Sequence, residues 1–79
     1  NIPDLIICDI LMPEMNGYDF VKQIRSSGLF NNIPLLMLSG EEDSKTRISF
    51  YKLRVRNFIT KPFNPEELEV LVDLILSEK

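Results

Sequence analysis

Three short apolar runs, each followed by a segment with helical periodicity, constrain the fold of this chain more than any other feature of its sequence. The runs cover residues 5–8, 33–38 and 58–60. Apolar runs of this length without polar alternation are typical of strands buried on both faces. Three strand–helix repeats in succession predict an α/β fold with a parallel sheet and right-handed crossover connections.

The helical segments are predicted at residues 18–27, at residues 44–53 and after Asn64. Gly28 is a natural stop for the first of them. Asn64 has the side chain of a helix N-cap, and Pro65 suits the first helical position. The last helix carries an apolar stripe at helical spacing, formed by Leu68, Leu71, Val72 and Ile75.

Composition excludes several classes of function. The 79 residues suffice for one small domain. Histidine is absent from the sequence, which excludes histidine-based acid–base catalysis and the commonest transition-metal ligand. The net charge of −3 argues against direct binding to nucleic acid, and no apolar run approaches the roughly 18 residues of a membrane span. The single cysteine, Cys8, is predicted to be an unreactive residue packed in the core. One cysteine cannot form an internal disulfide, which favours a reducing, cytoplasmic location.

Polar side chains stand where each predicted strand ends. They are Asp9, Ser39 and Lys61. The carboxyl ends of parallel strands meet at one edge of a sheet, so these side chains are expected to converge there. A carboxylate, a hydroxyl and a lysine suit a phosphoryl acceptor, with the aspartate as nucleophile and the other two binding phosphoryl oxygens. Spacing alone equally allows a plain salt bridge between Asp9 and Lys61, with Ser39 capping the next helix.

Three sequence segments resemble the response-regulator receiver domain of two-component signalling. They are PDLIICDILMPEMNG, the SG that follows LLML, and the KPF that follows NFIT. Ser39 lies 30 residues after Asp9, and Lys61 lies 22 residues after Ser39, which is the usual spacing of that family. The resemblance implies a flavodoxin-like, three-layer α/β fold. Residues 1–79 would form strand–helix repeats three to five of the family fold, a partial βαβαβα unit with a parallel sheet.

The resemblance also implies roles for individual residues. Asp9 would be the phosphoacceptor, receiving a phosphoryl group from a histidine kinase or a phosphotransfer protein. Lys61 would bind the phosphoryl group, and Ser39 would be the hydroxyl that turns toward it. Phe58 would be the aromatic side chain that moves with Ser39 and changes an output face. Such a module is a signalling protein and not an enzyme.

Further implied features surround the phosphoryl site. Pro62 would follow a cis peptide bond, and Gly40 would be the small residue beside the phosphate. A magnesium ion would be bound by Asp9 and by the backbone carbonyl of Leu11, since Mg²⁺ favours oxygen ligands.

The sequence departs from the family pattern at its start. The family's first strand, first helix and second strand are absent, and with them the acidic pair that holds magnesium. Asn1 cannot be a translation start, so we expect a longer protein in which these residues are the C-terminal portion of the domain. Alone, they are expected to bind Mg²⁺ and to accept phosphate poorly, and to leave an apolar edge at residues 5–8 that invites pairing with another chain.

Two rival functions stay open at this point. The first is an interaction module, or a truncated receiver fragment, that binds partners without phosphorylation. The second is a haloacid-dehalogenase-like phosphatase, which also uses an aspartate at a strand end. That family requires a second aspartate two residues after the nucleophile, where this chain has Leu11.

Two surface features suggest partners. Lys52, Arg54 and Arg56 form a basic cluster near the expected output face, although they also suit a solvated helix C-terminus. Val70 and Leu74 lie off the apolar stripe of the last helix, where they could form a homodimer contact or pack on the absent first helix. An output domain or a second copy could therefore dock on the last two helices and the strand between them.

Overall fold

The parallel sheet predicted from the sequence is confirmed by a computed structural model, which describes residues 2–10, 16–28, 30–40 and 44–78. The strand order is β1-β2-β3, and both pairings are parallel. The elements in chain order are β1 (Ile6–Asp9), α1 (Gly17–Ser26), β2 (Leu35–Ser39), α2 (Ser44–Lys52), β3 (Asn57–Thr60) and α3 (Pro65–Ser77).

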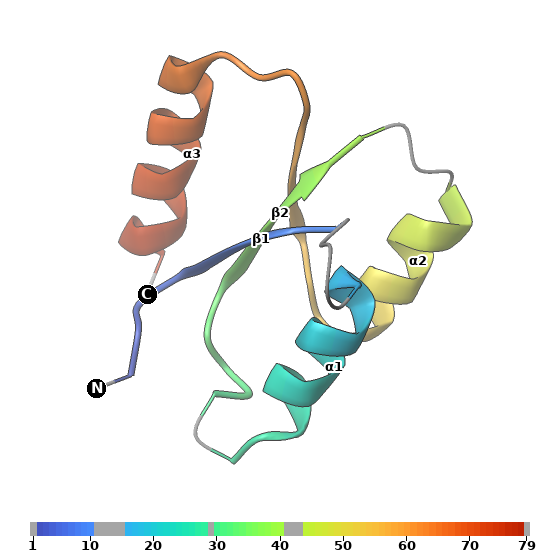
Figure 1. The fold of residues 1–79 in the computed structure, drawn as a ribbon. Helices are drawn as coiled ribbons and strands as arrows, with labels where there is room; N and C mark the ends of the chain where they lie inside the picture. The colour runs from blue at the N-terminus through green and yellow to red at the C-terminus, as the bar shows by residue number, and fades with distance from the viewer. Residues whose placement is uncertain (1, 11–15, 29, 41–43, 79) are drawn as a thin grey trace.

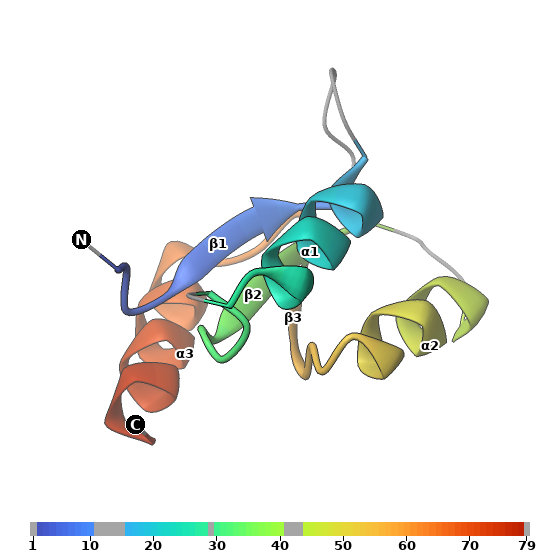
Figure 2. The ribbon, with the colours of Figure 1, turned by 90° about the horizontal axis from the view of Figure 1, so that it is seen from below.

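The elements form three layers. Helix α3 lies on one face of the sheet, and helices α1 and α2 lie on the other (Figures 1 and 2). Side-chain alternation along β2 divides the core accordingly: Leu35 and Met37 pack toward α1 and α2, whereas Leu36 packs with Ile59 and Ile75 toward α3. Strand β2 contributes fully buried side chains to both clusters and so links the two helical layers.

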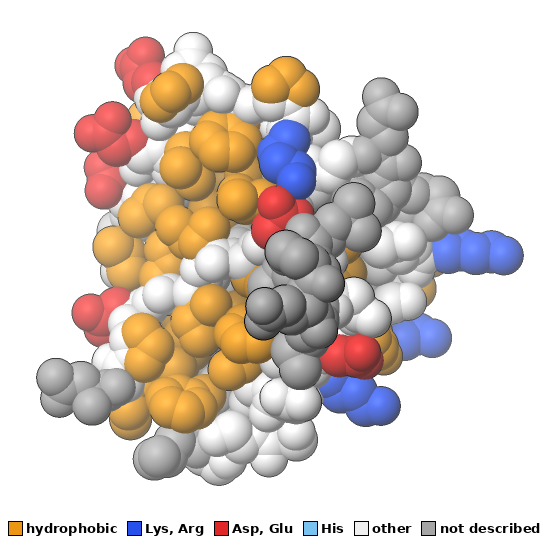
Figure 3. All heavy atoms as spheres, viewed as in Figure 1, with side chains coloured by type: hydrophobic (Ala, Val, Ile, Leu, Met, Phe, Trp, Pro, Cys, Tyr) orange, Lys and Arg blue, Asp and Glu red, His pale blue; other side chains and the backbone are white. Residues whose placement is uncertain are grey.

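Strand β1 differs from the prediction that it would be buried on both faces. Ile7 is 47% exposed, while its neighbour Cys8 is buried. The physical reason is that β1 is an edge strand, and the described helices cover the Cys8 side much better than the Ile7 side. Figure 3 shows the result as hydrophobic side chains gathered over α3 and the strand beside it. Val70 and Leu74 of α3 are exposed as well.

The helix ends confirm the predicted signals at Asn64 and Gly28. The Asn64 side chain accepts a hydrogen bond from the Glu66 backbone N–H at 2.8 Å, as an N-cap does. Helix α1 ends at Ser26 with Ser27 as its C-cap, so Gly28 directly follows the helix end as predicted, although its φ is not positive. The left-handed residue among those described is Arg54, which follows α2 with a φ of 65°. A non-glycine residue in this conformation is uncommon, and glycine would be the usual choice.

Arg25 joins two loops that precede strands. Its Nε donates to the Leu53 carbonyl at 2.8 Å, and its guanidinium also donates to the carbonyls of Ile33, Asn31 and Arg54. The sequence pattern gave no sign of this role for Arg25. The signal is absent because the partners are backbone atoms, which carry no residue type.

Gly17 is required by a close approach between α1 and the end of β1. A Cβ at this position would lie 2.8 Å from the Ile10 Cα and 2.9 Å from the Asp9 carbonyl oxygen. The Gly17 N–H also donates to the Ile10 carbonyl at 2.8 Å. A side chain here would therefore push against backbone atoms, which cannot rotate away.

We expect Gly17→Ala to lower the free energy of unfolding by about 1 to 3 kcal/mol, because the added methyl group overpacks a rigid contact. Gly28→Ala is the matched control, since a Cβ there meets nothing within 4 Å. That control should be neutral or stabilising by up to about 1 kcal/mol. Urea unfolding followed by circular dichroism compares the two, and equal midpoints would contradict the packing argument.

Candidate functional site

The carboxyl ends of the three strands meet at one rim, as the sequence predicted. Asp9 and Ser39 are the last residues of β1 and β2, and Lys61 directly follows β3. Sheet register sets their relative heights, because Asp9 pairs with Leu38 and Ser39 pairs with Thr60. The backbone N–H of Lys61 donates to the Ser39 carbonyl at 2.7 Å and extends this register by one residue.

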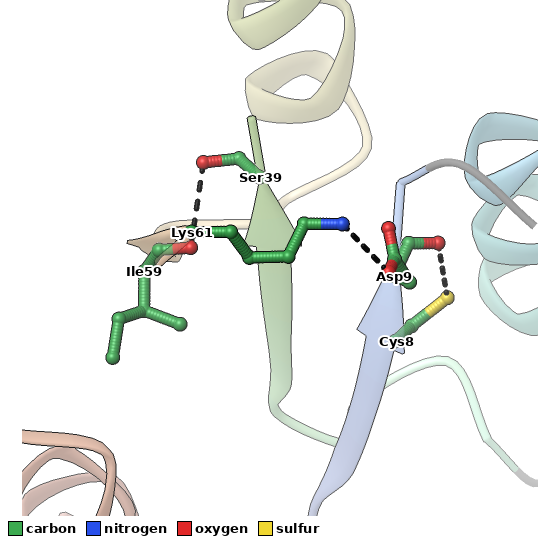
Figure 4. A network of polar contacts seen from close by, with 5 residues as sticks. All are labelled: Cys8, Asp9, Ser39, Ile59 and Lys61. Carbon is green, nitrogen blue, oxygen red and sulfur yellow. Dashed lines mark hydrogen bonds and ion pairs between the residues drawn. The ribbon is translucent and has the colours of Figure 1, made fainter. Parts of the chain in front are cut away.

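Asp9 and Lys61 form an ion pair across the rim. The lysine Nζ lies 2.8 Å from the aspartate Oδ2, and each side chain is about a third exposed. Figure 4 shows the lysine reaching from its own strand end across β2 to the aspartate. A carboxylate in this place can act as a nucleophile, and the cation is already positioned to bind an anion that forms there.

The Ser39 hydroxyl is not part of this ion pair. It is buried and donates to the Ile59 carbonyl at 3.4 Å. In Figure 4 it points away from Asp9. The serine thus stands at the predicted position on the rim, but its described hydrogen bond lies within the sheet.

Phe58 belongs to a chain of aromatic rings in edge-to-face contact. Its ring centroid lies 6.1 Å from that of Phe50 and 5.7 Å from that of Tyr51. Phe50 in turn lies 5.9 Å from Tyr18 at the start of α1. The half-buried Phe58 ring is therefore linked to both helices on its side of the sheet. The sequence analysis missed this chain, because its rings come from three different elements.

Three predicted positions around the phosphoryl site remain: Pro62, Gly40 and Leu11. The peptide bond between Lys61 and Pro62 is cis. Gly40 directly follows Ser39 and is half-buried. Leu11, whose carbonyl was predicted as a metal ligand, lies outside the described residues.

A complete magnesium site is not formed by the described residues. Among them, no group of three or more acidic, cysteine or histidine side chains lies together. Asp9 provides one carboxylate, and its Oδ2 is held by Lys61. One carboxylate is too small a set of protein oxygens to assign the ion to these residues alone.

Comparison with known proteins assigns the chain to a family. Residues 1–73 match the response regulator receiver domain family. The chain belongs to this family. A receiver domain is a signalling module rather than an enzyme, and the family-level role is that of a phosphoacceptor. Receiver domains generally bind Mg²⁺.

Individual relatives agree with the family assignment. The chain is 40% identical over 77 residues to hybrid signal transduction histidine kinase D of Dictyostelium discoideum, covering 98% of this chain and 5% of that protein. It is 34% identical over 79 residues to response regulator Rre1 of Synechocystis sp., covering 100% of this chain and 34% of that protein. The chain therefore spans a minor part of these relatives.

Solved structures agree on the fold. The signal receiver domain of a signal transduction histidine kinase from Syntrophus aciditrophicus superposes with a TM-score of 0.81 at 33% identity, covering 99% of this chain and 59% of that one. The family match favours a signalling receiver over a haloacid-dehalogenase-like phosphatase.

No helix among the described residues of this receiver is long and apolar enough to cross a membrane.

Cys8 offers a test of the packing beneath Asp9. Its side chain is buried, and its pKa is raised above the usual range, first by burial and then by the Asp9 charge. Since the thiolate is the reactive form, a raised pKa moves the onset of reaction to higher pH.

We therefore expect the folded receiver to react with Ellman's reagent at least about tenfold more slowly than the same chain in urea, because the thiol is buried and its raised pKa leaves less thiolate than in the unfolded chain. The reaction of the folded protein should accelerate only as the pH rises above the pKa of an ordinary thiol. Equal rates in the two states would show that the interior side of β1 is open to solvent.

Proposed function

We propose that Asp9 is the residue that accepts the phosphoryl group in this receiver. The observation that carries this proposal is the position of its carboxylate at the carboxyl edge of the sheet, 2.8 Å from the Lys61 ammonium, in a chain that matches the receiver family over residues 1–73. The donor is the phosphohistidine of a histidine kinase or of a phosphotransfer protein. Two-component partners of this kind are consistent with the hybrid kinase and response regulator relatives.

The transfer step moves the phosphoryl group from a donor nitrogen to an oxygen of Asp9. An Asp9 carboxylate oxygen attacks phosphorus, an O–P bond forms, and the N–P bond of phosphohistidine breaks. The electron pair of that bond returns to the imidazole of the donor. Lys61 then exchanges a carboxylate oxygen for a phosphoryl oxygen, which keeps its charge paired while the negative charge on the rim grows.

Ser39 is proposed to couple this charge to the conformation. Phosphorylation adds about −1.5 to −2 charge and three acceptor oxygens at Asp9. To donate to one of them, the Ser39 hydroxyl must leave the Ile59 carbonyl, which it contacts at a long 3.4 Å. The movement changes the space next to Phe58, whose ring contacts Phe50 and Tyr51 of α2. The phosphoryl group thereby shifts a population between two packings and does not create a new one.

We propose the phosphorylated form for a complete domain in which these 79 residues would supply strand–helix repeats three to five. Residues outside this segment would form the family's first strand and first helix and would add acidic ligands to Asp9 for magnesium. The exposed apolar side chains of β1 and α3, among them Ile7, Val70 and Leu74, support this proposal, because such a face needs cover (Figure 3). The setting is cytoplasmic, and an output domain or a second copy would read the surface of α2, β3 and α3.

Replacing the nucleophile tests the central assignment. In the complete protein, Asp9→Asn should abolish labelling by acetyl phosphate and by a phosphorylated kinase, because the amide is not a nucleophile for this step. Asp19→Asn is the matched control, since Asp19 is an exposed carboxylate on α1 that the site does not use. Labelling is measured by phosphate-affinity electrophoresis. Undiminished labelling of the Asp9 variant would assign the acceptor to another residue, and an unlabelled parent protein would favour a phosphorylation-independent interaction module.

A second substitution separates phosphorylation from its response. Ser39→Ala should remain labelled but lose most of the chemical-shift change that a phosphate mimic produces around Phe58 and α2. Ser26→Ala is the control, because its hydroxyl donates within α1 to the Lys22 carbonyl. Backbone NMR of the complete domain measures both variants. Parent-like shifts in the Ser39 variant would show that the hydroxyl does not carry the coupling.

A further inference from the structure

A cavity of about 420 Å³ lies at the end of the sheet opposite Asp9. Its walls come from the segments that precede β2 and β3 and from the C-terminal part of α3. Its volume falls in the range of about 300 to 1,000 Å³ that is usual for small-molecule sites. We call it the arginine groove, because Arg25, Arg54 and Arg56 line it.

The arginine groove concentrates positive charge. Glu78 is the one acidic side chain among its described lining residues, against the three arginines. The formal balance in the groove is therefore +2, in a chain whose net charge is −3. A concave surface with charge of one sign raises the local concentration of ions of the opposite sign.

The described partners of Arg25 do not neutralise its charge. The four hydrogen bonds described for its guanidinium all go to backbone carbonyls, which are polar but uncharged. The Asn31 carbonyl accepts from Arg25 at 3.3 Å and from Arg54 at 3.1 Å, so two guanidinium groups meet at one oxygen atom. Burial and, to a smaller degree, the charge of Arg54 lower the pKa of Arg25. An anion placed between these groups would relieve the repulsion between them.

Arg54 and Arg56 are exposed enough to bind a ligand. The contacts described for them use one nitrogen each: Arg54 donates to Asn31, and Arg56 lies 4.0 Å from a Glu78 carboxylate oxygen. The second contact is weak, since both side chains are mostly exposed. A guanidinium group has five N–H donors in a planar fork that matches carboxylate and phosphate oxygens.

We propose that the arginine groove binds a small organic molecule that carries a dianionic group, either a phosphate monoester or a dicarboxylate. The oxyanion would lie against Arg54 and Arg56, near the charge of Arg25. Among the apolar lining residues, Pro34 is half-buried and can contact the carbon skeleton of the ligand, whereas Ile33, Leu35 and Ile75 are buried. The site is independent of the Asp9 rim, because it lies at the other end of the strands. A bound ligand would join Arg54, which follows α2, to the C-terminal end of α3.

Titration calorimetry of the complete protein tests the proposal with three probes: inorganic phosphate, adenosine monophosphate and succinate. We expect saturable binding of at least one organic dianion, weakened by added salt. A preference for adenosine monophosphate identifies the phosphate monoester, and a preference for succinate identifies the dicarboxylate. Saturation by inorganic phosphate alone, or by none of the probes at millimolar concentration, would overturn the proposal.

Two variants locate the site. Arg54→Gly removes a guanidinium but suits the φ of 65°, so the fold should persist while affinity falls about tenfold or more. Arg56→Gln should weaken binding in the same direction. Lys45→Gln is the matched control, because it removes one exposed positive charge at the other end of α2 and should leave affinity unchanged.

Failure of the arginine-groove proposal can be distinguished from failure of the phosphoacceptor assignment. Asp9→Asn should bind the probes as the parent does, since Asp9 does not line the groove. Thermal melting checks that Arg54→Gly is folded. Parent-like affinity in both arginine variants, or an equal loss in the Lys45 control, would show that binding is not at the arginine groove.

Discussion

The hydrogen bonding of β2 to a parallel strand on each side is the constraint on which the rest of the structure depends. It brings Asp9 and Lys61, which are 52 residues apart in sequence, to a separation of 2.8 Å between charged atoms. It also divides the core, because alternate β2 side chains pack on opposite helical layers. A change of register by one residue would exchange these faces and move Ser39 off the rim.

Several parts of this arrangement were predictable from local sequence. The apolar runs predicted the three strands, and parallel topology then predicted which side chains meet at the rim. Asn64 and Pro65 predicted the start of α3, because a cap needs only its own side chain and the nearby backbone. Each of these inferences depends on contacts between neighbours in sequence or on a general rule of sheet topology.

Other features depend on contacts that sequence patterns do not encode. Ile7 is apolar but exposed, because β1 is at the edge of the described sheet. Arg54 has a left-handed backbone where glycine is usual, and Arg25 is held by the carbonyls of distant loops. The Ser39 hydroxyl was predicted in position but not in direction, since its described partner is the backbone carbonyl of Ile59 on another strand. Side-chain direction and edge exposure both require the three-dimensional neighbours.

The aromatic chain at Phe58 has a consequence for spectroscopy. The sequence contains no tryptophan and two tyrosines, and both tyrosines belong to this chain. Tyr51 contacts Phe58 directly, while Tyr18 is connected to it through Phe50. The near-ultraviolet spectrum of this segment therefore arises largely from rings beside the proposed switch. The two tyrosine rings are therefore an intrinsic spectroscopic probe, and a displacement of Phe58 can be followed without attaching a dye.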